Sequence, residues 1–349
     1  MPPIETTALP GALTHTKYDI GRVPDVVNTF ADFTQSENCT INSLELHGAF
    51  EPLCQTKEEV LEAMTTGGRI GFDAPFSPQG CDMRWFSADE MCRIMSKFDR
   101  IFILGDSMMR NVAVALSVLL RQDFIMGGRA NWVDLPEDLG SDCKCAQPFE
   151  TRKCAYYSTV STRVVWNNDP DSLSCPREAG GGFEYNSLLQ YPIQKVDMDD
   201  FTRHLSMPSP PKKPYAFIMG HGLWNDLEID KTYAWVDQAL EGITKAAPYL
   251  KKRPESFHKL FLGPNAAGIK KPEIFVARQG NIALTKFEKA VAPFVQDRGF
   301  DFLGTYNATI QTNNPDGTHG GMRNNLLKAM MIFNWLHKID TGDYSHAEV

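Results

Sequence analysis

The chain has 349 residues, of which 42% are hydrophobic, and its formal net charge is -8 at pH 7. A chain of this length and composition buries a sizeable core, which excludes a disordered protein and a small domain held together by disulfides alone. The acidic balance argues against nucleic acid as a partner, because neutralising phosphates takes clustered Lys and Arg, and only short basic runs such as 251–253 occur. No run of roughly 18 apolar residues occurs either, so we expect no stable membrane insertion.

The chain begins with residues 1–35, which mix Pro, Gly and Thr without periodicity and predict an extended N-terminal arm. No flexible linker divides the remainder. We therefore expect one domain over residues 36–340, with an insertion at about 129–190, and a C-terminal tail over 341–349.

Eight cysteines all lie in the first half of the chain, at positions 39, 54, 81, 92, 143, 145, 154 and 175. Their even number and loop-rich settings predict disulfides and an oxidising compartment. The acceptor triplets for N-glycosylation at Asn38 and Asn307 point the same way, so we expect a secreted protein or one of the secretory-pathway lumen, Golgi or extracellular. A zinc site is the weaker alternative, because no Cys-x2-Cys pair or nearby His supplies metal spacing. We expect no metal and no organic cofactor.

Four short continuous apolar runs occupy residues 101–104, 215–219, 260–262 and 300–303. Continuous apolarity predicts strands that are covered on both faces, as in a parallel sheet. Helical patterns follow these runs, at 112–120, 275–294 and 324–338. The alternation predicts an α/β fold in which helices flank a doubly wound parallel sheet.

Ser107 follows the first apolar run directly, after Gly105 and Asp106. A serine at a strand-to-helix turn exposes its hydroxyl at the sheet edge, and the helix N-terminus offers N–H groups to a developing oxyanion. The alternative is that Asp106 or Ser107 only caps the helix, and for the Gly-Asp-Ser motif alone this alternative is the stronger one.

Asp316 and His319 make the interpretation of Ser107 as a nucleophile stronger than its interpretation as a helix cap. A hydroxyl nucleophile needs a base and the base needs an orienting acceptor, which an Asp and a His on one short turn supply together. The alternative is a helix cap beside an exposed His. Because both motifs lie in expected strand-end loops and in the expected order, we interpret Ser107, Asp316 and His319 as a catalytic set.

Further site residues follow from the same loops. For the oxyanion hole we expect the N–H of Ser107, the amide of Asn225 and the N–H of Gly128, with residues 180–182 as a rival to Gly128. For substrate binding we expect Trp224 as a wall or a sugar-stacking surface, together with Arg110 and His221. His221 fits a packing or loop role better than that of the base.

Three blocks of the sequence resemble those of the SGNH (GDSL) hydrolase superfamily, namely 105–107, 222–226 and 316–319. More specifically, residues 68–69, 78–88 and 103–111 are similar to segments of the PC-esterase group, which includes the plant trichome birefringence-like polysaccharide O-acetyltransferases and their animal and fungal relatives. The resemblance implies an SGNH-like α/β domain with a cysteine-bearing N-terminal segment, catalysis by Ser107, Asp316 and His319, and Asn225 in the oxyanion hole. The chain departs from the plant pattern where Gly317 and Gly320 occupy a neighbourhood in which those enzymes carry cysteines.

These observations predict a carbohydrate O-acetylesterase that removes acetyl groups from a poly- or oligosaccharide through an acyl-enzyme. A polysaccharide O-acetyltransferase with the same triad is the alternative, because both share the first half-reaction. A third interpretation, an inactive carbohydrate-binding relative, is disfavoured by the intact Ser107, Asp316 and His319.

Overall fold

The computed structural model describes residues 52–139, 142–177, 180–205 and 212–339. The expected N-terminal arm and C-terminal tail lie outside these residues. Among the described residues, no helix has both the length and the apolarity that crossing a membrane requires.

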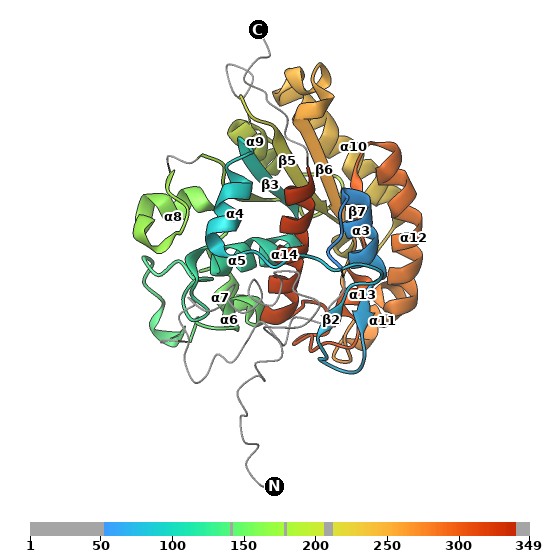
Figure 1. Ribbon diagram of the computed structural model, residues 1–349. Coiled ribbons are helices and arrows are strands. Elements are labelled where there is room, and N and C mark those ends of the chain that lie inside the picture. The colour runs from blue at the N-terminus through green and yellow to red at the C-terminus, as the bar shows by residue number, and fades with distance from the viewer. Residues whose placement is uncertain (1–51, 140–141, 178–179, 206–211, 340–349) are drawn as a thin grey trace.

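The centre of the fold is a five-stranded parallel sheet (Figure 1). Its strands are β3 (Arg100–Gly105), β4 (Phe183–Ser187), β5 (Tyr215–Gly220), β6 (Phe257–Leu262) and β7 (Asp301–Leu303), in the spatial order β4-β3-β5-β6-β7. Four of these strands coincide with the apolar runs, and the runs of β3, β5 and β6 are buried on both faces of the sheet. The run at β7 is only half-buried at Asp301 and Phe302. The predicted α/β fold with a helix-flanked parallel sheet is confirmed.

Two helical layers cover the sheet because successive strand residues point to opposite faces. Ile101 and Ile103 belong to one buried cluster, and Phe102 and Leu104 to the other. The first cluster packs against α3 (Lys57–Thr66), α4 (Ala88–Met95), α5 (Ser107–Arg121) and α14 (Met322–Lys338). The second packs against α9 (Lys195–Leu205), α10 (Ile229–Ala246) and α12 (Asn281–Asp297). Figure 1 shows α14 crossing in front of the strands.

The remaining strands and α-helices are short. They are β1 (Gly68–Arg69) and β2 (Phe76–Ser77), which pair antiparallel, and α6 (Gln147–Glu150), α7 (Arg152–Ala155), α8 (Thr162–Asn168), α11 (Glu273–Gln279) and α13 (Tyr306–Thr309). Figure 1 shows α6 and α7 below α5, on the side of the molecule opposite α11 and β2.

The strand order reverses at a position where open parallel sheets commonly bind ligands. The chain runs from β3 to the edge strand β4 and then returns to β5 on the other side of β3. In an open parallel sheet, a ligand binds beyond the carboxyl ends of the strands at such a switch point, here between β3 and β5. Ser107 follows β3 and therefore lies at this point.

The edge strand β4 was not predicted and lies inside the segment interpreted as an insertion, 129–190. Its sequence, Phe-Glu-Tyr-Asn-Ser, has no continuous apolar run. Glu184 is nevertheless 6% exposed, because Arg163 and Arg100 pair with its carboxylate at 3.1 and 3.8 Å. Long-range ion pairs therefore permit a polar strand to be buried at this edge.

The helix predicted over 275–294 is in fact two helices, α11 and α12, which are separated at Gly280. The extended backbone of Gly280 ends α11, and its N–H donates to Val276 O. At the start of α12, the side-chain amide of Asn281 pairs with both backbone groups of Ala267, in the loop after β6. This contact, which sequence periodicity does not reveal, sets the direction of α12.

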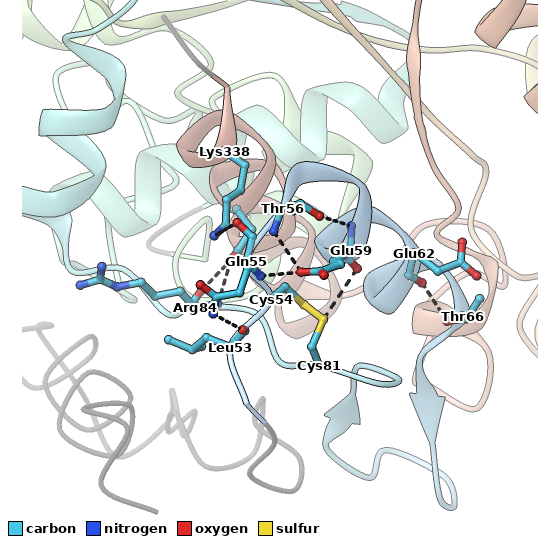
Figure 2. Close-up of a disulfide and its surroundings, with 11 residues drawn as sticks. Leu53, Cys54, Gln55, Thr56, Glu59, Glu62, Thr66, Cys81, Arg84 and Lys338 are labelled. Carbon is cyan, nitrogen blue, oxygen red and sulfur yellow. Dashed lines mark hydrogen bonds between the residues drawn. A yellow bond between two sulfur atoms is a disulfide. The ribbon is translucent and has the colours of Figure 1, made fainter.

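Three disulfides join described cysteines, Cys54–Cys81, Cys92–Cys175 and Cys143–Cys154. They confirm the prediction of disulfides and are consistent with a secreted or lumenal protein. Figure 2 shows Cys54–Cys81 beside the first turn of α3, where Thr56 and Glu59 form a capping box. In the same view, Lys338 at the end of α14 donates to Gln55 O, so both ends of the described chain are fastened to one another.

Candidate active site

The turn between β3 and α5 presents the hydroxyl of Ser107. Gly105 has φ +144°, and a Cβ at this position would lie 2.1 Å from Gly220 O, so only glycine fits. Asp106 is the cap of α5, because its Oδ1 accepts the N–H of Met108 at 2.9 Å. The capping role thus falls to Asp106, and the Ser107 side chain is left for another partner.

That partner is His319, from a loop 212 residues further along the chain. The Ser107 hydroxyl donates to His319 Nε2 at 2.7 Å, and His319 Nδ1–H donates to Asp316 Oδ2 at 2.6 Å. The three side chains predicted as a catalytic set therefore form one continuous hydrogen-bonded series. In this arrangement the neutral imidazole has its acceptor nitrogen directed at the serine.

Asp316 is held as a carboxylate. Its Oδ1 also accepts the backbone N–H groups of Thr318 and His319, at 2.8 and 2.7 Å. Burial raises the pKa of the Asp316 carboxyl. The hydrogen bond and charge of His319, together with the two backbone donors, lower this pKa by more, so it lies well below its usual range. Gly317 has φ +77°, and a Cβ there would lie 2.0 Å from Lys271 N, so this tight turn requires glycine.

A buried polar cluster supports the loop that carries Asp316 and His319. Asn325 Nδ2, on α14, donates to Gly320 O at 2.7 Å and to Gly321 O at 3.0 Å. On the same helix, Lys328 Nζ donates to Asn265 Oδ1 at 3.1 Å. Burial lowers the pKa of Lys328 to about 7, against the opposing effect of the Asp106 carboxylate. The sequence analysis missed these residues, although polar side chains on an otherwise apolar helix were an available signal.

The triad opens into a cavity of about 680 Å³. One wall contains Ser107, Asp316, His319 and Trp224, and the other is formed by the segment 149–160, which carries α6 and α7. Tyr185, Ser187 and Leu189 also line the cavity, as does Arg110. Two aromatic side chains in the lining are largely exposed, Trp224 by 54% and Tyr156 by 75%.

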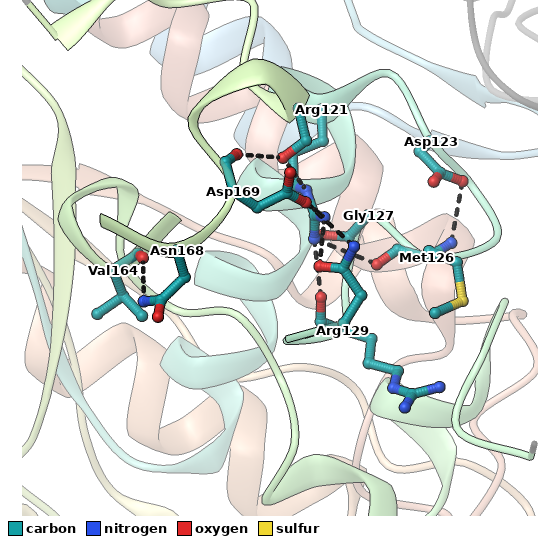
Figure 3. Close-up of polar contacts among 10 residues, drawn as sticks. Arg121, Asp123, Met126, Gly127, Arg129, Val164, Asn168 and Asp169 are labelled. Atoms are coloured by element: carbon teal, nitrogen blue, oxygen red, sulfur yellow. Dashed lines mark hydrogen bonds and ion pairs between the residues drawn. The ribbon is translucent and has the colours of Figure 1, made fainter. Parts of the chain in front are cut away.

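The chain before and after the segment that forms the second wall is anchored at the end of α5. The Arg121 side chain is 2% exposed, and its guanidinium donates to Arg129 O at 2.7 Å and to Asp169 Oδ2 at 2.9 Å. Figure 3 shows Arg121 inside this ring of partners, which includes Gly127 O. Between Arg129 and Asp169, the disulfide Cys143–Cys154 joins the start of this segment to the chain before it.

Other predicted site residues lie outside the cavity lining. His221 is 4% exposed, stacks on Trp235, donates to Asn225 Oδ1 and accepts from Thr232 Oγ1. Burial lowers its pKa to about 4, so it is a neutral packing residue. Gly128 lies against Val114 and Val118, two to three turns into α5, and its carbonyl accepts from Thr159 N–H.

Asn225 is engaged with the loop before α9. Its Oδ1 accepts the N–H of Tyr191 at 2.8 Å, and its Nδ2 donates to Tyr191 O at 3.1 Å. The structure therefore gives Asn225 a positioning contact between two strand-end loops. Tyr185, which the sequence analysis missed, donates to the carbonyls of Gly105 and Asp106 and so supports the turn that carries Ser107.

No cluster of three or more His, Cys, Asp or Glu side chains with the arrangement of a metal site occurs within the described ranges. Neither the protein-family models nor the curated proteins that were compared with this sequence contain a match.

Proposed function

We propose that this chain is a serine-dependent carbohydrate O-acetylesterase of the SGNH and PC-esterase type. The observation that carries the proposal is the series Ser107–His319–Asp316 at the switch point of the sheet. It supplies a nucleophile, a base and an orienting carboxylate, each in hydrogen-bond contact with the next. The motif resemblance described above supplies the acetyl ester as the substrate group.

In the first half-reaction, Ser107 Oγ attacks the carbonyl carbon of the ester while His319 Nε2 takes the hydroxyl proton. Asp316 holds the imidazole in the required tautomer and stabilises the imidazolium. The N–H of Ser107, at the first position of α5, has no intrahelical acceptor and donates to the oxyanion. The imidazolium then protonates the departing sugar oxygen, the carbon–oxygen bond to the sugar breaks, and an acetyl-serine remains.

In the second half-reaction, His319 takes a proton from water, whose oxygen attacks the acetyl-serine carbonyl. Collapse of this intermediate returns the proton to Ser107 Oγ and releases acetate. Water reaches the triad, because the His319 side chain is 26% exposed and the Asp316 side chain is 50% exposed. This access favours hydrolysis over transfer.

The lining of the cavity favours a sugar as the alcohol part of the ester. Its volume of about 680 Å³ greatly exceeds the need of an acetyl group. Exposed Tyr156 and Trp224 offer flat apolar surfaces that suit the faces of sugar rings, and the side chains of Thr151, Ser158 and Ser187 offer hydroxyl groups. The same volume also supports the second candidate function, transfer of the acetyl group to an acceptor sugar bound beside the acyl-enzyme.

The test is to incubate the protein with p-nitrophenyl acetate, with and without an oligosaccharide acceptor, beside Ser107→Ala. We expect release of acetate that the acceptor does not divert, and a loss of turnover of about 10⁴-fold or more in the variant. Acetylated oligosaccharide as the main product would replace the esterase by the transferase. Full turnover by Ser107→Ala would refute both.

A further inference from the structure

Arg110 is a cation next to the nucleophile that the proposed reaction does not use. It lies one helical turn beyond Ser107 on α5, so both side chains project from the same side of the helix. Both line the cavity. The position of this guanidinium is therefore suited to contact a group of the substrate that lies beside the ester.

The hydrogen-bonding capacity of Arg110 is largely unused. Its Nη2 donates to Asn111 Oδ1 at 3.0 Å, while its Nε is buried and has no partner. Across the part of the chain that the structure describes, no carboxylate lies within 4 Å of this guanidinium. Burial lowers the pKa of Arg110, which means that its environment disfavours the charge.

Arg121, on the same helix, shows how this chain satisfies an arginine that serves structure. Its guanidinium donates to three backbone carbonyls and pairs with the carboxylate of Asp169. A partly buried cation without such partners costs free energy unless a ligand supplies them. The contrast indicates that the partner of Arg110 comes from outside the chain.

The charged groups around the cavity leave this cation available. Asp316 is committed to His319, and Glu150 is exposed on the second wall. Asp106 acts on Arg110 through space, but it is buried below the turn and has Met108 N–H as its hydrogen-bond donor. An anionic group that enters the cavity therefore meets an unpaired guanidinium beside Ser107.

We propose that the cavity selects an acidic glycan, in which a sugar carboxylate binds Arg110 while the acetyl ester lies at Ser107. The planar guanidinium matches the two oxygens of a carboxylate, and charge-assisted pairs of this kind are about twice as strong as neutral hydrogen bonds. This inference rests on the proposed function for the ester, but the binding of the carboxylate to Arg110 does not require turnover.

The experiment compares two acetylated oligosaccharides that differ only in one group, a uronic acid carboxylate or the primary alcohol obtained by its reduction. For the unaltered protein we expect kcat/KM to be about 10- to 100-fold higher on the acidic oligosaccharide. Arg110→Gln abolishes this preference, Arg110→Lys keeps part of it, and Arg203→Gln, at an exposed ion pair on α9, leaves it intact. On p-nitrophenyl acetate, which carries no carboxylate, we expect Arg110→Gln to lose less kcat/KM than on the acidic oligosaccharide, and Arg203→Gln to keep the turnover of the unaltered protein.

Two results would overturn the inference. One is equal kcat/KM on the two oligosaccharides, and the other is an equal loss by Arg110→Gln on all three substrates, which would assign Arg110 to the catalytic geometry. Calorimetric titration of the deacetylated acidic oligosaccharide tests binding alone, so an Arg110-dependent affinity without any ester hydrolysis would retain the inference and refute the esterase. In a further arm, inorganic phosphate competes with the deacetylated acidic oligosaccharide in the same titration. A lower Kd for phosphate than for the oligosaccharide would also overturn the inference, because it would assign the anion site to a phosphate.

Discussion

The two walls of the cavity are built in different ways. Ser107, Asp316 and His319 stand on turns at the carboxyl ends of the sheet, and Gly105 and Gly317 fix these turns by direct contact with neighbouring backbone. The second wall, residues 149–160, consists of short helices and loops. One disulfide holds Cys154, and Arg121 holds the chain before and after this segment. In the proposed function, the first wall supplies the reacting groups together with Trp224, and the second supplies Tyr156 and the hydroxyl groups of Thr151 and Ser158 for contacts with the sugar. Changes to one wall are therefore expected to alter catalysis, and changes to the other to alter selectivity.

The largest expected effect comes from the first wall. In Asp316→Asn the acceptor for His319 Nδ1–H is replaced by an amide that can select the wrong tautomer, so we expect kcat to fall by about 10⁴-fold on small esters and glycans alike. The measurement is steady-state kinetics on both substrates. Asp138→Asn, at an exposed pair with Lys153, is the matched control. Retention of more than a tenth of the activity by Asp316→Asn would contradict a shared triad.

A smaller effect is expected when the second wall is loosened. Arg121→Lys keeps the charge but loses most of the hydrogen bonds to 126–131 and Asp169, so the free energy of unfolding should fall by about 2 to 4 kcal/mol. Urea unfolding measures this loss. Arg298→Lys, at an ion pair with Asp237 near the surface, should change it by less than about 1 kcal/mol.

The same variant separates the two walls kinetically. Because Arg121 touches no member of the triad, we expect kcat/KM of folded Arg121→Lys to fall on glycans by more than on p-nitrophenyl acetate. An equal loss on both substrates would mean that the two walls do not act separately.

The smallest expected effect is a pH dependence from His221, behind the first wall. Burial lowers its pKa from 6.5 to about 4, so between these values the unfolded chain binds a proton that the folded chain does not. The stability that His221 contributes is complete above pH 6.5 and is lost as the pH falls toward 4. From pH 6.5 to about pH 5, the loss is about 2 kcal/mol.

The measurement for His221 is a difference between two proteins. Burial raises the pKa of Glu288 to about 7, so this group stabilises the fold on acidification and offsets His221 in the unaltered protein. Unfolding free energies of the unaltered protein and His221→Gln are therefore compared at both pH values. Their difference should shrink by about 2 kcal/mol on acidification, and parallel curves would show that His221 is not buried as a neutral ring.

The sequence predicted the first wall better than the second for a physical reason. Continuous apolar runs mark buried parallel strands, the polar residues directly after the first run mark the turn of Ser107, and the Asp-x-x-His motif just before the last helix marks Asp316 and His319. These signals are local. The strand β4, the break at Gly280 and the second wall depend on partners far along the chain, such as the ion pairs of Glu184 and the contact of Asn281 with Ala267.

The positions of individual side chains were also predictable only where a local signal determines them. Trp224 and Arg110, which the sequence predicts to bind substrate, both line the cavity, because they lie within a few residues of a strand end or of Ser107. His221 occupies an equally promising position, but its ring is turned into the core, where Trp235 and Thr232 hold it. The sequence therefore indicated which residues lie near the site. Whether a side chain faces the site depends on its packing, as the ring of His221 shows.

The central claim is that His319 makes the hydroxyl of Ser107 nucleophilic. The most direct measurement is reaction with an uncharged alkyl fluorophosphonate, followed by peptide mass spectrometry of the adduct. We predict a single adduct on Ser107, formed at least about 100-fold more slowly in His319→Ala and absent from Ser107→Ala. An adduct on a different residue, or ester hydrolysis by a protein that never labels at Ser107, would contradict the account.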